Sequence, residues 1–571
     1  MKISVFAGDS EPGLDQYVQE IFRSWGLPLC ESSDFQGASG LDPHSSPVAI
    51  ALPGVDGSLA ELLLDYVNRG GSLVSFLPAD ILAGAAGLKF TGEKQTPLRL
   101  RLPREPVAGL AGELLPVVGN AGNYEVIGES VQAYGYLSFP GQFHGETIGV
   151  AETAVGRGSI VAIAFDPPLS VLLCRQGDPA YAEQIPEGDG CARPSHLAAD
   201  IGPNDAAWIP YADLLSRWLV DLVVRLSGAP VPRLYHLPGE SRGILVYSGD
   251  EDHAEVAWNE DQFGWMAQND ARMNLYIIPE STHSTRADGE RYRQHHDLGP
   301  HPNLRPLDGE PVSIRISDLE RQILLFEEMY GIKSRSIRNH STAWAGYMEP
   351  VEVMEKLGIG MDGNYFSGTY RRDRESAPYA GFGGAIPMRY SQPNGRMLNV
   401  YQQHTHVADD VLFGRANYSY MFSLQQWEVI LDRIFTDIET RFHVPYAVCI
   451  HPGNWVRFSG DQGRALVREA QARRFPVWSF DQWLDFWEAR DSYSFSRLSW
   501  DGTRVTCELN SEKTHSELRM LLPLETNGMK LKEVFISDQK VDWTQTSLYR
   551  RQHALVELAG ADNEKLDATY E

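Results

Sequence analysis

The chain has 571 residues, a length that predicts two to four domains. Its formal net charge of −26 argues against nucleic acid or an anionic membrane surface as a partner. No stretch approaches the roughly 18 consecutive apolar residues that suggest a membrane span, so no membrane partner is expected. The 5 cysteines are scattered and form no CxxC pair. They predict a reduced, cytoplasmic protein without structural zinc.

The first region, residues 1–228, alternates apolar runs with an amphipathic segment. Runs that predict buried strands lie at Ile3–Phe6, Val48–Leu52 and Ser72–Phe76. Ser58–Asn68 carries its apolar residues on one helical face, and Gly70-Gly71 is typical of a helix end. This alternation predicts a parallel sheet covered by helices. Leu98–Phe165 has period-two patterning and Gly-rich turns, which predict an antiparallel section before a helix at Ala212–Leu226.

The remaining chain divides into a linker and two further regions. The Pro-rich stretch 227–238 is predicted to be a linker. Residues 242–489 alternate predicted strands and helices over a length sufficient for a (β/α) barrel. Residues 493–571 show short apolar runs separated by turn signals, which predict a small β-sandwich. The expected fold class is therefore α/β, with domains at 1–228, 242–489 and 493–571.

A cluster of acidic residues closes the first strand of the second region. Gly249-Asp250-Glu251-Asp252-His253 follows the apolar run Ile244–Tyr247. Clustered carboxylates repel one another unless a proton or a metal ion separates them. The carboxyl ends of strands are also where α/β folds place their chemistry. The alternative interpretation is a solvated acidic loop.

Further polar residues follow later predicted strands in the same region. They are His301, Arg338, His340, Asp362, Asn364 and His451. Parallel barrels bring such strand ends to one mouth, so we expect these side chains to meet. A lone histidine is more often solvated or hydrogen-bonded than a ligand, and this is the expectation for His295, His296, His404 and His406.

The order of these residues resembles the NodB-type polysaccharide deacetylases (carbohydrate esterase family 4), over about Gly243–Asp481. The resemblance implies a distorted (β/α) barrel with fewer than eight strands, and metal-dependent hydrolysis of N- or O-acetyl groups on sugars. Asp250 stands in the place of the family's general base, and Asp252 in that of its metal-binding aspartate. Glu251 is an alternative ligand, but residues two apart on an extended chain share a face, which favours Asp252.

The other motifs match only in part. His301 matches the first metal-binding histidine, but Arg305 stands where the second is usual. Arg338-Asn339-His340 takes the place of Arg-x-Pro, and His340 is our candidate for the missing ligand. His451 matches the histidine that protonates the leaving group. The implied catalytic set is Asp250, His451 and Arg338, and the implied metal ligands are Asp252, His301 and His340. This ligand set suits zinc or another first-row divalent ion.

The sequence therefore predicts a metal-dependent hydrolase that removes acetyl groups from a carbohydrate. A non-catalytic carbohydrate-binding or scaffolding protein with a degenerate site is the alternative, because one motif histidine is missing. A homo-oligomer is compatible with the sequence. Aromatic residues that would suit stacking against a sugar are Trp344, Trp455, Tyr347 and Tyr365, although most aromatic residues in such a chain are expected in the core.

The first region resembles the class I glutamine amidotransferase-like fold, a flavodoxin-like arrangement, through Asp65–Gly71 and the strand that follows it. A working amidotransferase needs a nucleophilic cysteine on a tight strand-to-helix turn. The turn after Ser72–Phe76 has the sequence Leu77-Pro78-Ala79, and Cys30 lies elsewhere. We therefore expect a binding or scaffolding role for this region, and glutamine-dependent amide transfer is disfavoured.

Overall fold

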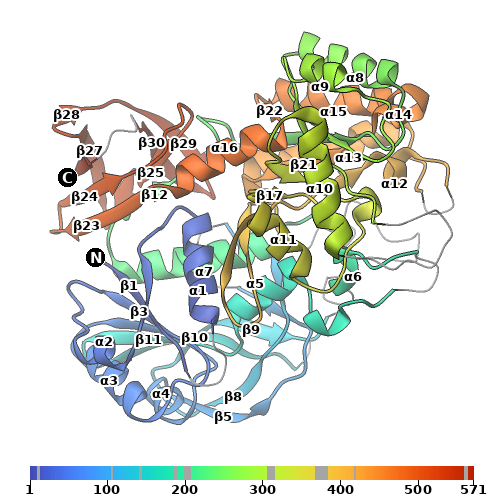
Figure 1. The fold of residues 1–571 in the computed structure, drawn as a ribbon. Helices are drawn as coiled ribbons and strands as arrows, with labels where there is room; N and C mark the ends of the chain where they lie inside the picture. Colours follow the sequence, from blue (N-terminus) through green and yellow to red (C-terminus); the bar gives the residue numbers. More distant parts are fainter. Residues whose placement is uncertain are drawn as a thin grey trace.

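The computed structural model describes residues 1–8, 13–103, 107, 109–140, 145–185, 190–198, 208–304, 316–366, 383–416, 419–558 and 563–571. Helices and sheets, both parallel and antiparallel, alternate along the chain, which confirms the predicted α/β class (Figure 1). Within these residues, no helix is long and apolar enough to cross a membrane.

The N-terminal part is built on a mixed sheet of nine strands in the order β2-β1-β3-β4-β11-β10-β9-β6-β7. Its parallel strands are β1 (Ile3–Phe6), β2 (Cys30–Ser33), β3 (Val48–Ala51), β4 (Ser72–Phe76) and β11 (Gly158–Ile163). Its antiparallel strands are β6 (Leu98–Arg101), β7 (Leu114–Val117), β9 (Gln132–Ser138) and β10 (Thr147–Val155). The predicted change from parallel to antiparallel pairing is therefore confirmed. The order β2-β1-β3-β4 is that of flavodoxin-like sheets.

Further elements surround this sheet. The helices are α1 (Leu14–Ser24), α2 (Phe35–Ser39), α3 (Gly57–Asn68), α4 (Asp80–Ala85), α5 (Pro167–Gln176), α6 (Pro194–Leu197) and α7 (Tyr211–Ser227). A separate two-stranded sheet joins β5 (Leu88–Glu93) and β8 (Gly122–Val126). Two residues after the end of α3, Gly70 has φ of 117°, and a side chain at Gly71 would collide with the Tyr66 ring. Both positions therefore require glycine. The turn after β4 carries Leu77 at φ 45° and no cysteine.

The central part contains two sheets whose strands run mostly parallel. One has the order β15-β14-β13-β21-β20, with β22 also paired to β13. Its strands are β13 (Ile244–Asp250), β14 (Asn274–Ile277), β15 (Asp297–Pro300), β20 (Val407–Ala408), β21 (Pro445–Cys449) and β22 (Val477–Trp478). The other sheet has β16 (Ser336–Ile337), β17 (Met361–Asp362) and β19 (Met397–Gln402), with β18 (Met388–Ser391) antiparallel to β19.

Two backbone hydrogen bonds join these two sheets. On one side the Arg338 N–H donates to the Pro300 carbonyl (3.4 Å). On the other, the Thr405 N–H donates to the Tyr365 carbonyl (2.8 Å). The carboxyl ends of β13, β15, β16 and β21 consequently lie around one mouth, which is the placement that the site requires.

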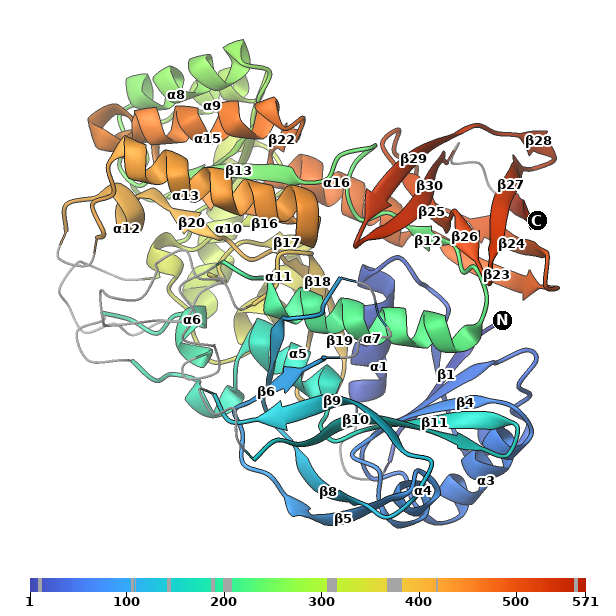
Figure 2. The same ribbon diagram turned by 180° about the vertical axis from the view of Figure 1, so that it is seen from behind.

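Helices cover the outside of the central part. They are α8 (Val256–Gln268), α9 (Arg286–Tyr292), α10 (Ile316–Tyr330), α11 (Glu349–Leu357), α12 (Asp409–Phe413), α13 (Leu424–Asp437), α14 (Pro452–Asn454), α15 (Gly460–Ala472) and α16 (Phe480–Asp491). Short helical turns η2 (His340–Thr342), η3 (Ile438–Phe442) and η4 (Trp455–Ser459) interrupt them. Both views show α8, α13 and α15 gathered on one side, with β13 beside them in the view from behind (Figures 1 and 2).

The C-terminal part contains two antiparallel sheets. One has the order β12-β25-β30-β29, and the other β23-β24-β31-β27-β26 with β28 beside β27. Their strands are β12 (Arg233–Leu234), β23 (Ser494–Trp500), β24 (Arg504–Asn510), β25 (Arg519–Pro523), β26 (Glu525–Thr526), β27 (Met529–Ile536), β28 (Gln539–Lys540), β29 (Trp543–Leu548), β30 (Arg551–Glu557) and β31 (Glu564–Tyr570).

The interpretation of residues 227–238 as a linker is wrong. Within this stretch, β12 pairs with β25 of the C-terminal part, and residues 234–238 are buried. The apolar side chains of Leu234, Tyr235 and Leu237 explain the burial, because they enter the common core. The domain boundaries at 228, 242, 489 and 493 stay predictions.

A single cluster of buried hydrophobic residues extends through the N-terminal, central and C-terminal parts. Arg490 of α16, which is fully buried, joins the three parts. Its guanidinium donates to the carbonyls of Arg23 and Ser24 at the end of α1, and to those of Leu234 and Tyr235 at β12. It also pairs with Asp491 at 2.9 Å. The parts are therefore packed against one another.

Candidate metal centre

The acidic side chains at the end of β13 point into two different environments. Asp250 is the last residue of β13, and Asp252 follows in a turn with φ of 52°. Glu251, between them, accepts hydrogen bonds from Asn259 Nδ2 (2.9 Å) and Ser284 Oγ (2.6 Å). Because alternate residues of a strand point to opposite faces, Glu251 turns into this separate buried network. Asp252 therefore joins the histidines in place of Glu251.

Asp252, His301 and His340 come together at the mouth. Asp252 Oδ1 lies 3.3 Å from His301 Nε2 and 3.0 Å from His340 Nδ1. One ligand atom from each residue lies within 4.8 Å of the other two. The three strand ends that carry them are far apart in sequence, so the tertiary fold brings this group together.

The hydrogen bonds of His301 show that the group fits a cation. Its Nδ1 lies 2.7 Å from the Arg338 carbonyl, which can only accept, so Nδ1–H donates and Nε2 is the nitrogen that faces the cluster. Nε2 is buried and has no hydrogen-bond partner among the described residues. A lone pair that faces a carboxylate oxygen at 3.3 Å is repelled unless a proton or a cation lies between them. Burial opposes a charge on His301, but Asp250 and Asp252 outweigh it and raise the pKa of His301.

Arg338 fixes the orientation of Asp250. Its guanidinium is buried and donates from Nη1 to Asp250 Oδ1 (3.1 Å) and Ser248 Oγ (2.7 Å). It also donates to Thr405 Oγ1 (2.8 Å) and the Gly363 carbonyl (3.1 Å). Burial alone would raise the pKa of Asp250, but nearby His301, Arg338 and His451 lower it below its usual value. Asp250 is thus held as a carboxylate.

His451 is oriented by a carboxylate that the sequence analysis missed. Its Nδ1 lies 2.5 Å from Oδ1 of the fully buried Asp409, whose Oδ2 accepts from Ser459 Oγ (2.6 Å). Its Nε2 faces the cluster, 3.8 Å from Asp252 Oδ2 and 4.0 Å from Asp250 Oδ2. Burial opposes protonation, but Asp409, then Asp252 and Asp250, raise the pKa of His451 well above its ordinary value.

Asp362 and Asn364 support the turn that carries His340. Asn364 Oδ1 accepts the Asn339 N–H (2.8 Å), and Asp362 accepts from the hydroxyl of Tyr390 (2.5 Å). Burial raises the pKa of Asp362 to about 6. Both residues are fully buried, so they serve as a support for the site. Arg305, which replaces the expected motif histidine, lies outside the described residues.

The remaining histidines behave as predicted. His296, His404 and His406 are buried, and each has one ring nitrogen hydrogen-bonded to the backbone. His295 is exposed. None of the four belongs to the three groups of His, Cys, Asp and Glu that could hold an ion within the described chain.

Of the two interpretations of Trp344, Trp455, Tyr347 and Tyr365, the structure supports a place in the core and not sugar stacking. All four are buried. Their polar atoms bond within the protein: Trp344 Nε1 donates to the Tyr347 carbonyl (3.0 Å), and Trp455 Nε1 to Asp261 (2.9 Å). Buried rings offer no face to a ligand, so these residues belong to the core.

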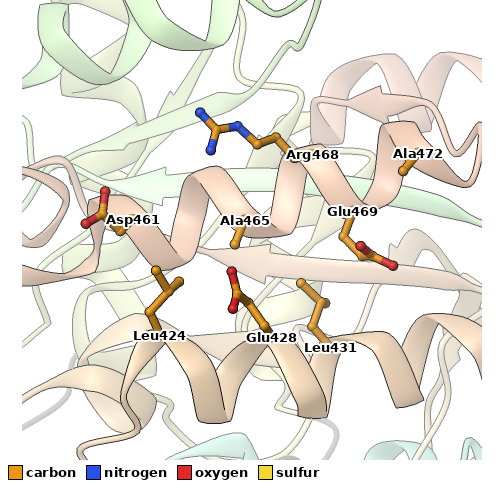
Figure 3. A pocket seen from close by; sticks show the side chains of 8 residues that line it. All are labelled: Leu424, Glu428, Leu431, Asp461, Ala465, Arg468, Glu469 and Ala472. Atoms are coloured by element: carbon orange, nitrogen blue, oxygen red, sulfur yellow. The ribbon is translucent and has the colours of Figure 1, made fainter.

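A groove between α13 and α15 lies outside the barrel mouth (Figure 3). Its lining residues are Leu424, Glu428, Leu431, Asp461, Ala465, Arg468, Glu469 and Ala472. It shares no residue with the carboxylate–histidine cluster, and it contains no histidine or cysteine. The chemistry of the cluster therefore does not extend into this groove.

No family model matches the chain, and a search of curated proteins finds no match. Among solved structures it is similar to Agd3, which is described as a novel carbohydrate deacetylase. The two sequences are 11% identical, the match covers 100% of this chain and 98% of that chain, and the TM-score is 0.41. A Mycobacterium smegmatis protein assigned as a polysaccharide deacetylase gives 12% identity over 46% of this chain and 95% of that chain, with a TM-score of 0.33. A β-galactosidase from Bacillus circulans sp. alkalophilus gives 13% identity over 29% of this chain and 28% of that chain, with a TM-score of 0.23. At such scores none of these likenesses assigns a fold or an activity to this chain.

Proposed function

We propose that this chain is a metal-dependent hydrolase that removes acetyl groups from an N- or O-acetylated carbohydrate. The observation that carries the proposal is one cluster with three parts: the ligand set of Asp252, His301 and His340, the oriented carboxylate of Asp250, and the His451–Asp409 pair. Metal-assisted hydrolysis needs a cation site flanked by a base and an acid. The choice of an acetylated carbohydrate rests on the motif order shared with NodB-type deacetylases.

Asp252, His301 and His340 would hold the ion, and their oxygen and nitrogen donors suit zinc or a related divalent ion. When bound, the ion supplies Lewis-acid polarisation of the acetyl carbonyl and makes water more acidic. Asp250 then accepts a proton from the attacking water, and Arg338 keeps its carboxylate oriented. His451, held by Asp409, donates a proton to the leaving nitrogen or oxygen.

His340 also bears on the alternative of a degenerate, non-catalytic site. That alternative rests on Arg305 in the place of a ligand. His340 Nδ1 lies 3.0 Å from Asp252 Oδ1, so three ligand side chains are still present. This favours a functional centre over a decayed one.

The test is release of acetate from a panel of acetylated oligosaccharides. The purified chain is stripped with a chelator and then reloaded with zinc. We expect acetate release only from the loaded form. Asp250→Asn should retain zinc but lose turnover by roughly 10²–10⁴-fold, because it removes the base and leaves the ligands in place. Asp461→Asn, at an exposed carboxylate, is the matched control. Zinc-loaded protein that releases no acetate from any substrate would contradict the proposal.

A further inference from the structure

Cys449 lies beside the proposed base and acid but has no part in the proposed reaction. It ends β21, two residues before His451, and β21 places it in register with Ser248 of β13. Its Sγ, a carboxylate oxygen of Asp250 and a ring nitrogen of His451 all lie within 4.8 Å of one another. The thiol is 1% exposed. A sulfur donor is therefore fixed between the two groups that move protons.

Hydrogen bonds occupy one oxygen of Asp250 and one ring nitrogen of His451. Asp250 Oδ1 accepts from Arg338, which leaves Oδ2 directed toward His451 Nε2 at 4.0 Å. His451 Nδ1 is occupied by Asp409, which leaves Nε2 as the available nitrogen. One oxygen, one nitrogen and one sulfur donor thus lie close together. Zinc sites with three protein ligands and an open fourth position use donors of these kinds.

We infer that Asp250, Cys449 and His451 form a second metal site, selective for thiophilic divalent ions, whose occupation inhibits the hydrolase. On binding, the Cys449 thiol and the protonated Nε2 of His451 each release a proton to solvent, and sulfur–metal and nitrogen–metal bonds form. The lone pairs of Asp250 Oδ2 and His451 Nε2 become ligands, so Asp250 can no longer accept a proton and His451 can no longer donate one. The inhibitory part rests on the proposed function, but the metal site does not.

Ligand softness makes the site selective. Thiolate favours zinc and cadmium over magnesium and manganese, whereas a set of one carboxylate and two imidazoles accepts a wider range of ions. Excess zinc or cadmium should therefore inhibit, and excess manganese should not.

Cobalt titration of the metal-free chain tests the site without an activity assay. We expect two bound Co²⁺ ions and a near-ultraviolet sulfur-to-cobalt charge-transfer band. Cys449→Ser and Cys449→Ala should each lose this band and retain one ion, which also shows that they are folded. Cys507→Ser, at a buried cysteine of β24, should keep the band. A wild-type chain with no sulfur band, or a band that persists in both Cys449 variants, would overturn the inference.

The inhibitory part is tested by the ratio of acetate release in excess zinc to that in one equivalent. In the wild type, acetate release should be roughly 10-fold slower in excess zinc than in one equivalent, once free zinc is about ten times the Kd of the second site. In Cys449→Ser the two rates should be nearly equal. A wild-type ratio that stays near one while the cobalt band is present would refute inhibition. The absence of acetate release in every form, with the cobalt band intact, would instead refute the proposed function.

Discussion

His340 is the single residue on which the metal centre depends most, because no second motif histidine is present in the sequence. We expect His340→Ala to weaken zinc binding steeply, by more than the roughly 10–100-fold that second-sphere changes cost. Acetate release should be lost together with the ion. Competition against a chelator of known affinity measures the change. His295→Ala, at an exposed histidine, is the control, and equal zinc affinity in the two variants would show that His340 is not a ligand.

Asp409 is expected to act only through His451. Asp409→Asn keeps a polar side chain beside Nδ1 but removes the charge that favours protonated His451. We expect kcat to fall, by up to the roughly 10²–10⁴-fold that a positioned acid contributes, while zinc affinity and KM change little. Steady-state kinetics with zinc analysis would check this. A variant that loses zinc, or whose KM alone changes, would argue against the role.

The six residues selected from the sequence converge in the structure, because the carboxyl ends of the strands that carry them lie around one mouth. Asp409 was not selected. It reaches His451 through the pairing of β20 with β21, and β20 has only two residues, too few to leave a periodic pattern. The choice between Asp252 and Glu251 was open in the sequence and depends on the buried partners of Glu251.

At the scale of elements, α16 connects all three parts of the chain through Arg490. Arg490→Ala would leave four buried carbonyls without this donor. We expect a loss of roughly 3–5 kcal/mol in the free energy of unfolding, since a buried charge and its acceptors lose their partner. Urea denaturation measures it. Arg497→Ala, which breaks an exposed ion pair with Glu508, should cost no more than about 1 kcal/mol. Equal urea midpoints of unfolding for Arg490→Ala and Arg497→Ala would contradict the role of Arg490.

Elements with strong local signals were predictable, and elements defined by distant pairing were not. Ser58–Asn68 carries its apolar residues on one helical face and lies in α3, and the apolar run at Ser72–Phe76 is β4. Residues 227–238 were misinterpreted because proline and glycine indicate turns but say nothing about burial. Strand β12 exists because β25, almost three hundred residues later, pairs with it.

At the scale of the whole molecule, buried neutral histidines should make the fold sensitive to acid. Burial lowers the pKa of His236 to about 3 and that of His406 to about 3. The unfolded chain binds protons at these residues below about pH 6.5, whereas the folded chain does not. Stability is therefore lost as pH falls through 6.5, by about 1.4 kcal/mol for each such residue between pH 7.5 and 5.5.

His236→Gln tests this dependence, because glutamine retains an N–H donor for the His443 carbonyl but does not titrate. Urea unfolding of both proteins at pH 7.5 and 5.5 should show a smaller acid-induced loss in the variant. An identical loss in both proteins would mean that His236 does not contribute.

The central claim is that Asp252, His301 and His340 bind one divalent ion at the barrel mouth. Anomalous diffraction at the zinc edge, from crystals grown with one equivalent of zinc, tests it most directly. We predict one peak, at about 2.0–2.2 Å from an oxygen of Asp252 and a nitrogen of each histidine. A peak bound elsewhere, or a His340 ring turned away from Asp252 and His301 with no ion between them, would contradict the claim.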